Sequence, residues 1–215
     1  MHERPHNEEE LQKREAIGVI RASRFVRKYA RTHKPISFAT VCDIHKEIFK
    51  EAWPEIAGKF RDENLEITDS KHLPPHHSKV LELVEKADRE LKEKLAALSH
   101  AEGDLIDMKN IEEGGDVIEQ VVYAAAWLHH SITHIHPFRE GNGRTARLAG
   151  NLILERYGLV GISIKIEREN KNRYRATLAQ IDQKGDYEPL VNLIYEGLLE
   201  RYGGASLELP LTPHS

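Results

Sequence analysis

The sequence lacks most of what marks a secreted, membrane-bound or nucleic-acid-binding protein. Cys42 is the only cysteine in 215 residues, so no internal disulfide can form. No apolar run approaches the length of a membrane span, and residues 1–10 lack the apolar core of a signal peptide. The formal net charge of -4 argues against a general nucleic-acid-binding surface. We therefore expect a cytoplasmic protein with no membrane and no nucleic-acid partner.

The composition is that of one globular domain. Hydrophobic residues make up 40% and charged residues 31% of the chain, and the length suffices for a single buried core. We expect residues 8–202 to form this domain. Residues 1–7 are predicted to be a flexible N-terminus. Residues 203–215, which contain two adjacent glycines and two prolines, are predicted to be a flexible tail.

Apolar residues recur at helical spacing along most of the chain, which predicts an all-α fold. A loop is expected over residues 99–115, which contain Gly103, Gly114, Gly115 and several acidic residues. The predicted helices cover residues 8–31, a segment from Ser37, a segment after Ser78, and residues 118–135, 144–157, 170–183 and 186–202.

Residues 58–75 interrupt the helical period. Leu65 and Ile67 alternate with Glu66 and Thr68, and two prolines end the segment. This pattern is typical of a short β-hairpin or an extended flap. The predicted fold is therefore a helical bundle with a small β-hairpin flap.

The densest group of chemically active side chains lies in residues 136–147, HPFREGNGRTAR. The run Gly141-Asn142-Gly143 can turn tightly at the start of the next predicted helix, where backbone N–H groups favour an anion. Arg144 and Arg147 stand one helical turn apart and can hold the same polyphosphate. This pattern indicates a phosphate-binding site.

Three further side chains of this run, those of His136, Glu140 and Asn142, suit phosphate chemistry. His136 titrates near neutral pH and is a candidate general base. Glu140 is a candidate ligand for a divalent cation held against the phosphates. Asn142 is expected to donate from its side chain to an α-phosphate oxygen, and Phe138 to anchor the loop in the core. Taken singly, each polar residue has an ordinary reading, as a helix cap, a turn residue or a solvated side chain.

Residues 136–147 resemble the signature of the Fic family, His-x-Phe-x-(Asp/Glu)-Gly-Asn-Gly-Arg-x-x-Arg, and every specified position is filled. The likeness extends to the segments 174–182 and 185–190, and more loosely to residues 58–75. It implies a protein adenylyltransferase that uses ATP and Mg²⁺. Such an enzyme transfers AMP to a tyrosine, threonine or serine hydroxyl of a target protein and releases pyrophosphate.

The resemblance also implies roles outside the signature. Tyr174 and Asp182 fall where family members line the pocket for the nucleotide base. The flap, with Leu65, Ile67, Thr68 and His72, would align the target by strand-like pairing. Doc-type relatives, which phosphorylate their targets, have lysine where this chain has Gly143, so AMP transfer is favoured.

Three alternatives stay open at this point. The enzyme could transfer another nucleotide monophosphate or a phosphocholine group, or the chain could be a non-catalytic module regulated by a nucleotide. A zinc site is also conceivable, because His129, His130, His134 and His136 lie close in sequence. However, His129 and His130 point to different sides of a helix, so these residues fit a zinc site poorly.

An element that restrains many Fic proteins is not found in this sequence. It is a helix with the pattern (Ser/Thr)-x-x-x-Glu-(Gly/Asn), whose glutamate pairs with the second signature arginine, here Arg147. Glu196-Gly197 comes nearest, but Asn192 stands at the Ser/Thr position. We therefore expect inhibition in trans by a small antitoxin-like partner, and a toxin-like effect of the isolated chain. A diverged internal brake is the alternative.

Overall fold

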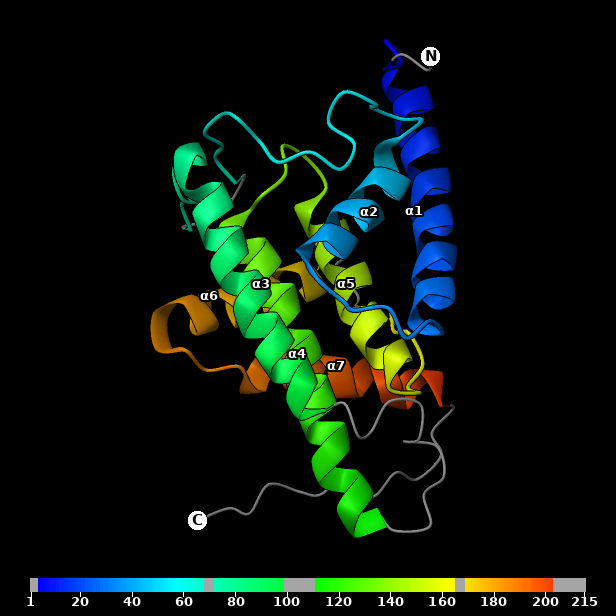
Figure 1. Ribbon diagram of the computed structural model, residues 1–215. Coiled ribbons are helices and arrows are strands. Elements are labelled where there is room, and N and C mark those ends of the chain that lie inside the picture. The colour runs from blue at the N-terminus through cyan, green and yellow to red at the C-terminus, as the bar shows by residue number, and fades with distance from the viewer. Residues whose placement is uncertain (1–3, 68–71, 99–110, 165–168, 203–215) are drawn as a thin grey trace.

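The fold is seen in a computed structural model, which describes residues 4–67, 72–98, 111–164 and 169–202, with only the backbone for residues 111–114 and 169. Within these ranges lie α1 (Glu8–Ala30), α2 (Phe38–Phe49), a short 3-10 helix η1 (His77–Lys79), α3 (Val80–Ala97), α4 (Ile111–Ile135), α5 (Asn142–Arg156), α6 (Glu169–Lys184) and α7 (Glu188–Arg201) (Figure 1).

The described residues confirm the all-helical class. They contain no strand, and none of their helices is long and apolar enough to cross a membrane. The expected hairpin is not seen in residues 58–67 and 72–75, which run without strand pairing. Because Thr68 and the rest of 68–71 lie outside the described residues, the hairpin stays a prediction.

Helix α4 is the centre of the bundle. It packs mainly against α5 and also contacts α3, α6 and α7, while α1 packs on α2 and α5 (Figure 1). Its residues 121, 122 and 124–130 are all buried, which confirms the prediction of a central helix. Since α4 ends at Ile135, this buried helix fixes the position at which residues 136–147 begin.

Most predicted helix boundaries agree with the structure to within two residues. Ser37 forms a capping box with Thr40 at the start of α2, and Gly185, with φ of 68°, follows the end of α6. The loop predicted through residue 115 was wrong, because α4 already begins at Ile111. Gly114 and Gly115 each destabilise a helix by only about 1 kcal/mol relative to alanine. The packing of the long apolar segment that follows outweighs this cost.

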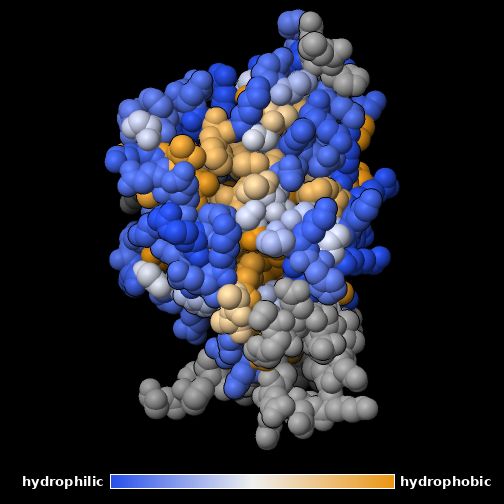
Figure 2. Space-filling view, viewed as in Figure 1, coloured by the Kyte–Doolittle hydropathy of each residue, from blue (hydrophilic) through white to orange (hydrophobic). Residues whose placement is uncertain are grey.

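Hydrophilic side chains cover most of the face seen in Figure 2, and hydrophobic ones gather along its middle. The amphipathic helices therefore turn their apolar sides toward one another. Helices α1 and α2 approach so closely at Gly18 that an added Cβ would lie 1.9 Å from the carbonyl oxygen of Ile48. This close packing sets α1 firmly against the part of the bundle that carries the site.

Candidate active site

The loop between α4 and α5 has an unusual backbone at both ends. His136 has φ of 51° and Gly141 has φ of 77°, so both residues adopt the left-handed conformation. Histidine is rarely found there, and such conformations persist only where the surroundings hold them. At Gly141 an added Cβ would lie 2.3 Å from the ring of Phe49, so only glycine fits this position. Helix α5 begins directly afterwards, at Asn142, two residues earlier than predicted.

Asn142 closes this loop on itself. Its Oδ1 accepts from the backbone N–H of Phe138 at 2.9 Å, and its Nδ2 donates to the Phe138 carbonyl at 2.7 Å. The side chain is only 2% exposed. Phe138 is fully buried, as predicted for an anchor. The amide of Asn142 therefore shapes the loop, and this geometry does not support the expected bond from its side chain to a phosphate.

His45 of α2 supports the loop between α4 and α5. Its Nδ1 accepts from the backbone N–H of Gly58 at 2.9 Å, so its Nε2 carries the proton and donates to the Glu140 carbonyl at 3.0 Å. The ring stacks on Phe138, with centroids 4.0 Å apart. Burial lowers the pKa of His45 to about 4, which keeps the ring neutral. One buried histidine thus links α2, the start of the flap segment and the loop.

Arg61 ties the flap segment to the loop. Its backbone N–H donates to the Pro137 carbonyl at 2.8 Å, and its Nε donates to the His136 carbonyl at 2.7 Å. Its other guanidinium nitrogens donate to carbonyls within the flap segment, those of Glu63 and Pro75. Arg61 is 5% exposed. These bonds hold His136 in its left-handed conformation.

The ring of His136 is oriented to act as a base. Its Nδ1 donates to the Thr133 carbonyl at 3.2 Å, because a carbonyl oxygen can only accept. In the neutral ring the lone pair then lies on Nε2. Burial lowers the pKa of His136 below its ordinary value, although the bond to Thr133 acts in the opposite direction. The neutral form with a basic Nε2 is therefore the main form near pH 7.

Glu140 and Arg144 contact each other beside the loop. Glu140 Oε1 accepts from the backbone N–H of Gly141 at 2.8 Å and from Arg144 Nη2 at 3.2 Å. Arg144 Nη1 also donates to Glu15 of α1 at 2.6 Å. The Glu140 side chain is 52% exposed, so a hydrated ion can reach it. Arg144 is held between two carboxylates at the start of α5.

Arg147 lies deeper than Arg144. It is largely buried and forms a hydrogen bond with the Tyr174 hydroxyl, which in turn contacts Nε2 of His129 at 2.7 Å. Burial lowers the pKa of His129 to about 3, so the ring is neutral and its Nε2 accepts a hydrogen bond from the Tyr174 hydroxyl. A Cβ added to Gly143 would lie 3.4 Å from Arg147 Nη1. The guanidinium therefore lies directly beside the first turn of α5.

One cavity brings some of the predicted residues together. It has a volume of about 680 Å³, which is in the range of small-molecule sites. Its walls come from the end of α4, the start of α5, much of α6 and the flap segment. The predicted residues that line it are Ile67, His72, His136, Gly143, Tyr174 and Asp182. Leu65, Glu140, Gly141, Asn142, Arg144 and Arg147 are not among its lining residues.

This combination of an oriented histidine, an anion-favouring helix start and a cavity of ligand size defines a candidate active site. Residues 35–154 match the Fic/DOC family. The chain belongs to this family, so the family resemblance of residues 136–147 is confirmed.

Curated relatives support the same assignment. The protein adenylyltransferase fic-1 of Caenorhabditis briggsae is 30% identical over 198 residues, which cover 89% of this chain and 34% of that protein. The protein adenylyltransferase Fic of Nematostella vectensis is 27% identical over 185 residues, which cover 86% of this chain and 38% of that protein. The chain thus spans little more than a third of the length of these relatives.

Solved structures share the fold. Fic-1 from C. elegans superposes with a TM-score of 0.67 at 24% identity and covers 91% of this chain and 52% of that chain. BepC from Bartonella tribocorum, solved with bound AMPPNP, has a TM-score of 0.60 at 18% identity, with 90% and 88% covered. At these identities the likeness concerns the fold alone.

His45 and Arg61 were not identified from the sequence as supports of the site. His45 follows Ile44 in a predicted helix. Only the structure shows that both of its ring nitrogens form hydrogen bonds to backbone groups. A polar residue on the apolar side of a predicted helix was the available signal. For Arg61 the available signal was an arginine in the segment between the second and the third predicted helix.

Proposed function

We propose that the chain is a protein adenylyltransferase that transfers AMP from ATP to a tyrosine, threonine or serine hydroxyl of a target protein. The orientation of His136 carries this proposal. Its Nδ1 is engaged by Thr133 and its basic Nε2 is left for a substrate proton, beside a cavity that the start of α5 adjoins. A catalytic base and an anion-favouring helix end at one cavity fit phosphoryl-centre chemistry.

In the proposed reaction His136 Nε2 takes the proton of the target hydroxyl as its oxygen attacks the α-phosphorus of ATP. The new bond joins that oxygen to phosphorus, and the bond from the α-phosphorus to the bridging oxygen breaks. Pyrophosphate leaves with the electron pair. The lowered pKa of His136 supports this role, because a neutral ring can accept the proton near pH 7.

The phosphates are proposed to bind at the start of α5. The backbone N–H groups of Gly141, Asn142 and Gly143 lie at the start of α5, where an N–H group has no acceptor within the helix. The N–H of Gly141 donates to the Glu140 side chain. Arg144 and Arg147 supply positive charge from the same turn. We assign Asn142 to positioning this loop, since both polar atoms of its amide are bound to Phe138.

Mg²⁺ fits Glu140 in this arrangement. Mg²⁺ binds through one or two carboxylates and completes its shell with waters and substrate phosphates, and the half-exposed Glu140 carboxylate offers such a ligand. When bound, Mg²⁺ would neutralise phosphate charge. Glu140 would also have to loosen its bond to Arg144, which leaves that arginine for the phosphates.

The remaining cavity residues are proposed to hold the nucleotide base and the target. Tyr174 and Asp182 lie on the α6 side of the cavity, and Ile67 and His72 lie on the flap side. Tyr174 donates to His129, so its ring is the part available to a base. The strand-like pairing of a target with Leu65, Ile67, Thr68 and His72 stays a prediction.

Control of the activity is proposed to come in trans, from a small antitoxin-like partner. Glu196, the nearest candidate for an internal brake, forms a two-pronged ion pair with Arg173 at 2.7 and 2.5 Å. This engagement supports the view that Glu196 is a surface residue of α7 and not a partner of Arg147.

Intact-mass measurement tests the proposed reaction. The purified chain is incubated with ATP and Mg²⁺, alone and with a lysate, and modified proteins should gain the mass of one AMP unit. A gain of a single phosphate instead would indicate phosphoryl transfer. No gain in any protein, at a Mg²⁺ and ATP concentration at which binding is measured, would support a non-catalytic nucleotide-binding module.

A further inference from the structure

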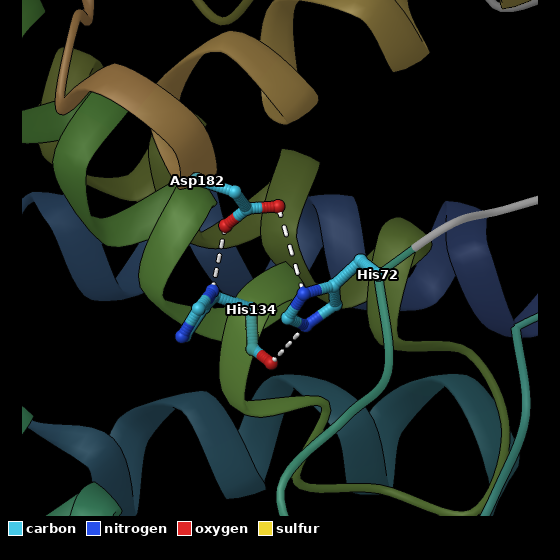
Figure 3. A group of neighbouring side chains, drawn as sticks. All are labelled: His72, His134 and Asp182. Atoms are coloured by element: carbon cyan, nitrogen blue, oxygen red, sulfur yellow. Dashed lines mark hydrogen bonds and ion pairs between the residues drawn. The ribbon is translucent and has the colours of Figure 1, made fainter.

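Three side chains from distant parts of the sequence meet at the rim of the cavity. His72 comes from the flap segment, His134 from the last turn of α4 and Asp182 from the end of α6 (Figure 3). One ligand atom of each lies within 4.8 Å of the other two. His134 Nδ1 lies 2.6 Å from Asp182 Oδ1, and His72 Nδ1 lies 3.6 Å from Asp182 Oδ2.

The proton arrangement of His72 calls for a cation at this place. Its Nε2 lies 2.8 Å from the backbone carbonyl of His134 and must donate to it. In a neutral ring, Nδ1 then carries a lone pair that faces the carboxylate of Asp182. Two electron-rich atoms at this separation repel each other unless a cation compensates. A metal ion at this position would supply that positive charge.

The surroundings of the three residues are typical of a supported metal site. Ligating histidines usually donate their other ring N–H to a carbonyl or carboxylate, as His72 does to His134. Asp182 Oδ1 also accepts from His130 Nε2 at 2.9 Å, and the Tyr187 hydroxyl donates to His130 Nδ1 at 3.3 Å. These hydrogen bonds fix the orientation of the Asp182 carboxylate.

We propose that His72, His134 and Asp182 form a binding site for a divalent transition-metal ion, with Zn²⁺ as the best match. Two imidazole nitrogens and one carboxylate oxygen suit Zn²⁺, whereas Mg²⁺ prefers oxygen ligands alone. Three protein ligands leave a fourth position for water on the cavity side. The ion replaces the proton between His134 and Asp182, so their 2.6 Å contact lengthens as the metal enters.

The site is separate from Glu140, and its metal binding can be measured without the proposed transfer reaction. Its consequence for the fold is a tie between the flap segment, α4 and α6, because each contributes one ligand. Bound Zn²⁺ should therefore raise the melting temperature of the whole chain. Since His72 and Asp182 also line the cavity, the ion would narrow its opening.

Calorimetric titration of Zn²⁺ into chelator-treated, tag-free protein at about pH 7.5 tests the site. We expect one ion per chain. His72→Ala, His134→Ala and Asp182→Asn should each weaken binding by more than about tenfold, the loss expected even for outer partners of a metal ligand. His76→Ala is the matched control, because His76 is an exposed histidine of the neighbouring segment that lies outside the triad. It should bind as the wild type does.

Several results would overturn the proposal. They are an absence of binding, a preference for Mg²⁺, or full binding by the double variant His72→Ala and His134→Ala. A loss of Zn²⁺ binding confined to His76→Ala would place the ion elsewhere and would also overturn the proposal. Zinc-edge X-ray absorption of the wild type decides the matter even if the variants do not fold. It should show two imidazoles at about 2.0–2.1 Å; one imidazole or none contradicts the site.

Discussion

Arg144 Nη1 lies 2.6 Å from Oε2 of Glu15, so the first helix of the chain holds an arginine of the turn that we propose to bind phosphate. The two side chains are 25% and 15% exposed, which makes this contact less screened than an ordinary surface pair. A polyphosphate that binds Arg144 must compete with Glu15 for the guanidinium. The contact joins α1 to α5 and should limit the affinity for the proposed nucleotide.

Glu15→Gln should strengthen ATP binding several-fold and weaken the fold. Loss of a charged hydrogen-bond partner costs about 1.5–3 kcal/mol of unfolding free energy, whereas the guanidinium becomes available to phosphate. Calorimetric titration with ATP and Mg²⁺, together with denaturant unfolding, measures both effects. Glu10→Gln, which removes an exposed pair with Arg14 on the same helix, is the control and should change neither. Weaker ATP binding by Glu15→Gln would show that the pair orders the arginine for the ligand.

Asn142→Ala should lower both stability and transfer rate. The substitution leaves the backbone N–H and carbonyl of Phe138 without their partner, in a place with 2% exposure, at a cost of about 1–3 kcal/mol per unsatisfied group. Asn142→Asp retains the acceptor for the Phe138 N–H but turns a carboxylate oxygen toward the Phe138 carbonyl in a buried place, so its loss of stability should be at least as large. Equal stability of wild type and Asn142→Ala in urea unfolding would contradict the loop-closing role.

The free energy of unfolding should fall as the pH falls from about 6.5 to about 4, in part because of His45. The unfolded chain binds a proton at His45 near pH 6.5, and the folded chain does so only near pH 4. Between these values the unfolded state holds more protons, so acid favours unfolding, and the loss is complete below the lower value. This gap corresponds to about 3 kcal/mol.

Urea unfolding at several pH values measures this dependence. His45→Gln should be less stable than the wild type at pH 7, because two backbone bonds and the stacking on Phe138 are lost. Its stability should also depend less steeply on pH over the same interval. His129, whose pKa burial lowers to about 3, keeps contributing in both proteins. An unchanged slope in His45→Gln would mean that the folded protein protonates His45 without cost.

Glu196→Gly should leave the transfer rate unchanged if inhibition comes in trans. Glu196 is bound to Arg173 on the surface of α6 and α7, so its removal frees no group of the active site. The variant is compared with the wild type in the intact-mass assay. A many-fold increase in rate would establish an internal brake and exclude the need for a partner.

The sequence predicted those features of the fold and site that depend on local pattern. The buried α4, the helix start at Ser37 and the anchor Phe138 follow from apolar spacing, a cap residue and an aromatic in the turn. The start of α4 at Ile111 did not, because two glycines suggest a loop and only packing further along the helix decides.

Contacts between distant segments lay beyond the reach of pattern. Glu15 meets Arg144 across 129 positions, and His72 meets Asp182 across 110. Both pairs depend on how helices pack, which a single sequence does not specify. The poor fit of His129 and His130 to a zinc site was judged within one helix, whereas the triad that the structure brings together uses only His134 from that helix.

The most direct test of the central claim compares two labels in ATP and two forms of the chain. Wild type and His136→Ala are incubated with Mg²⁺ and ATP labelled at the α- or the γ-phosphate, and ATP binding is measured in parallel. The account predicts that the wild type transfers the α-label and not the γ-label. His136→Ala should bind ATP as before and lose transfer by about 10²- to 10⁴-fold. Because burial lowers the pKa of His136, the wild-type rate should decline at a lower pH than an ordinary histidine base would give. Transfer of the γ-label, or transfer by His136→Ala at more than about a tenth of the wild-type rate, would contradict the account.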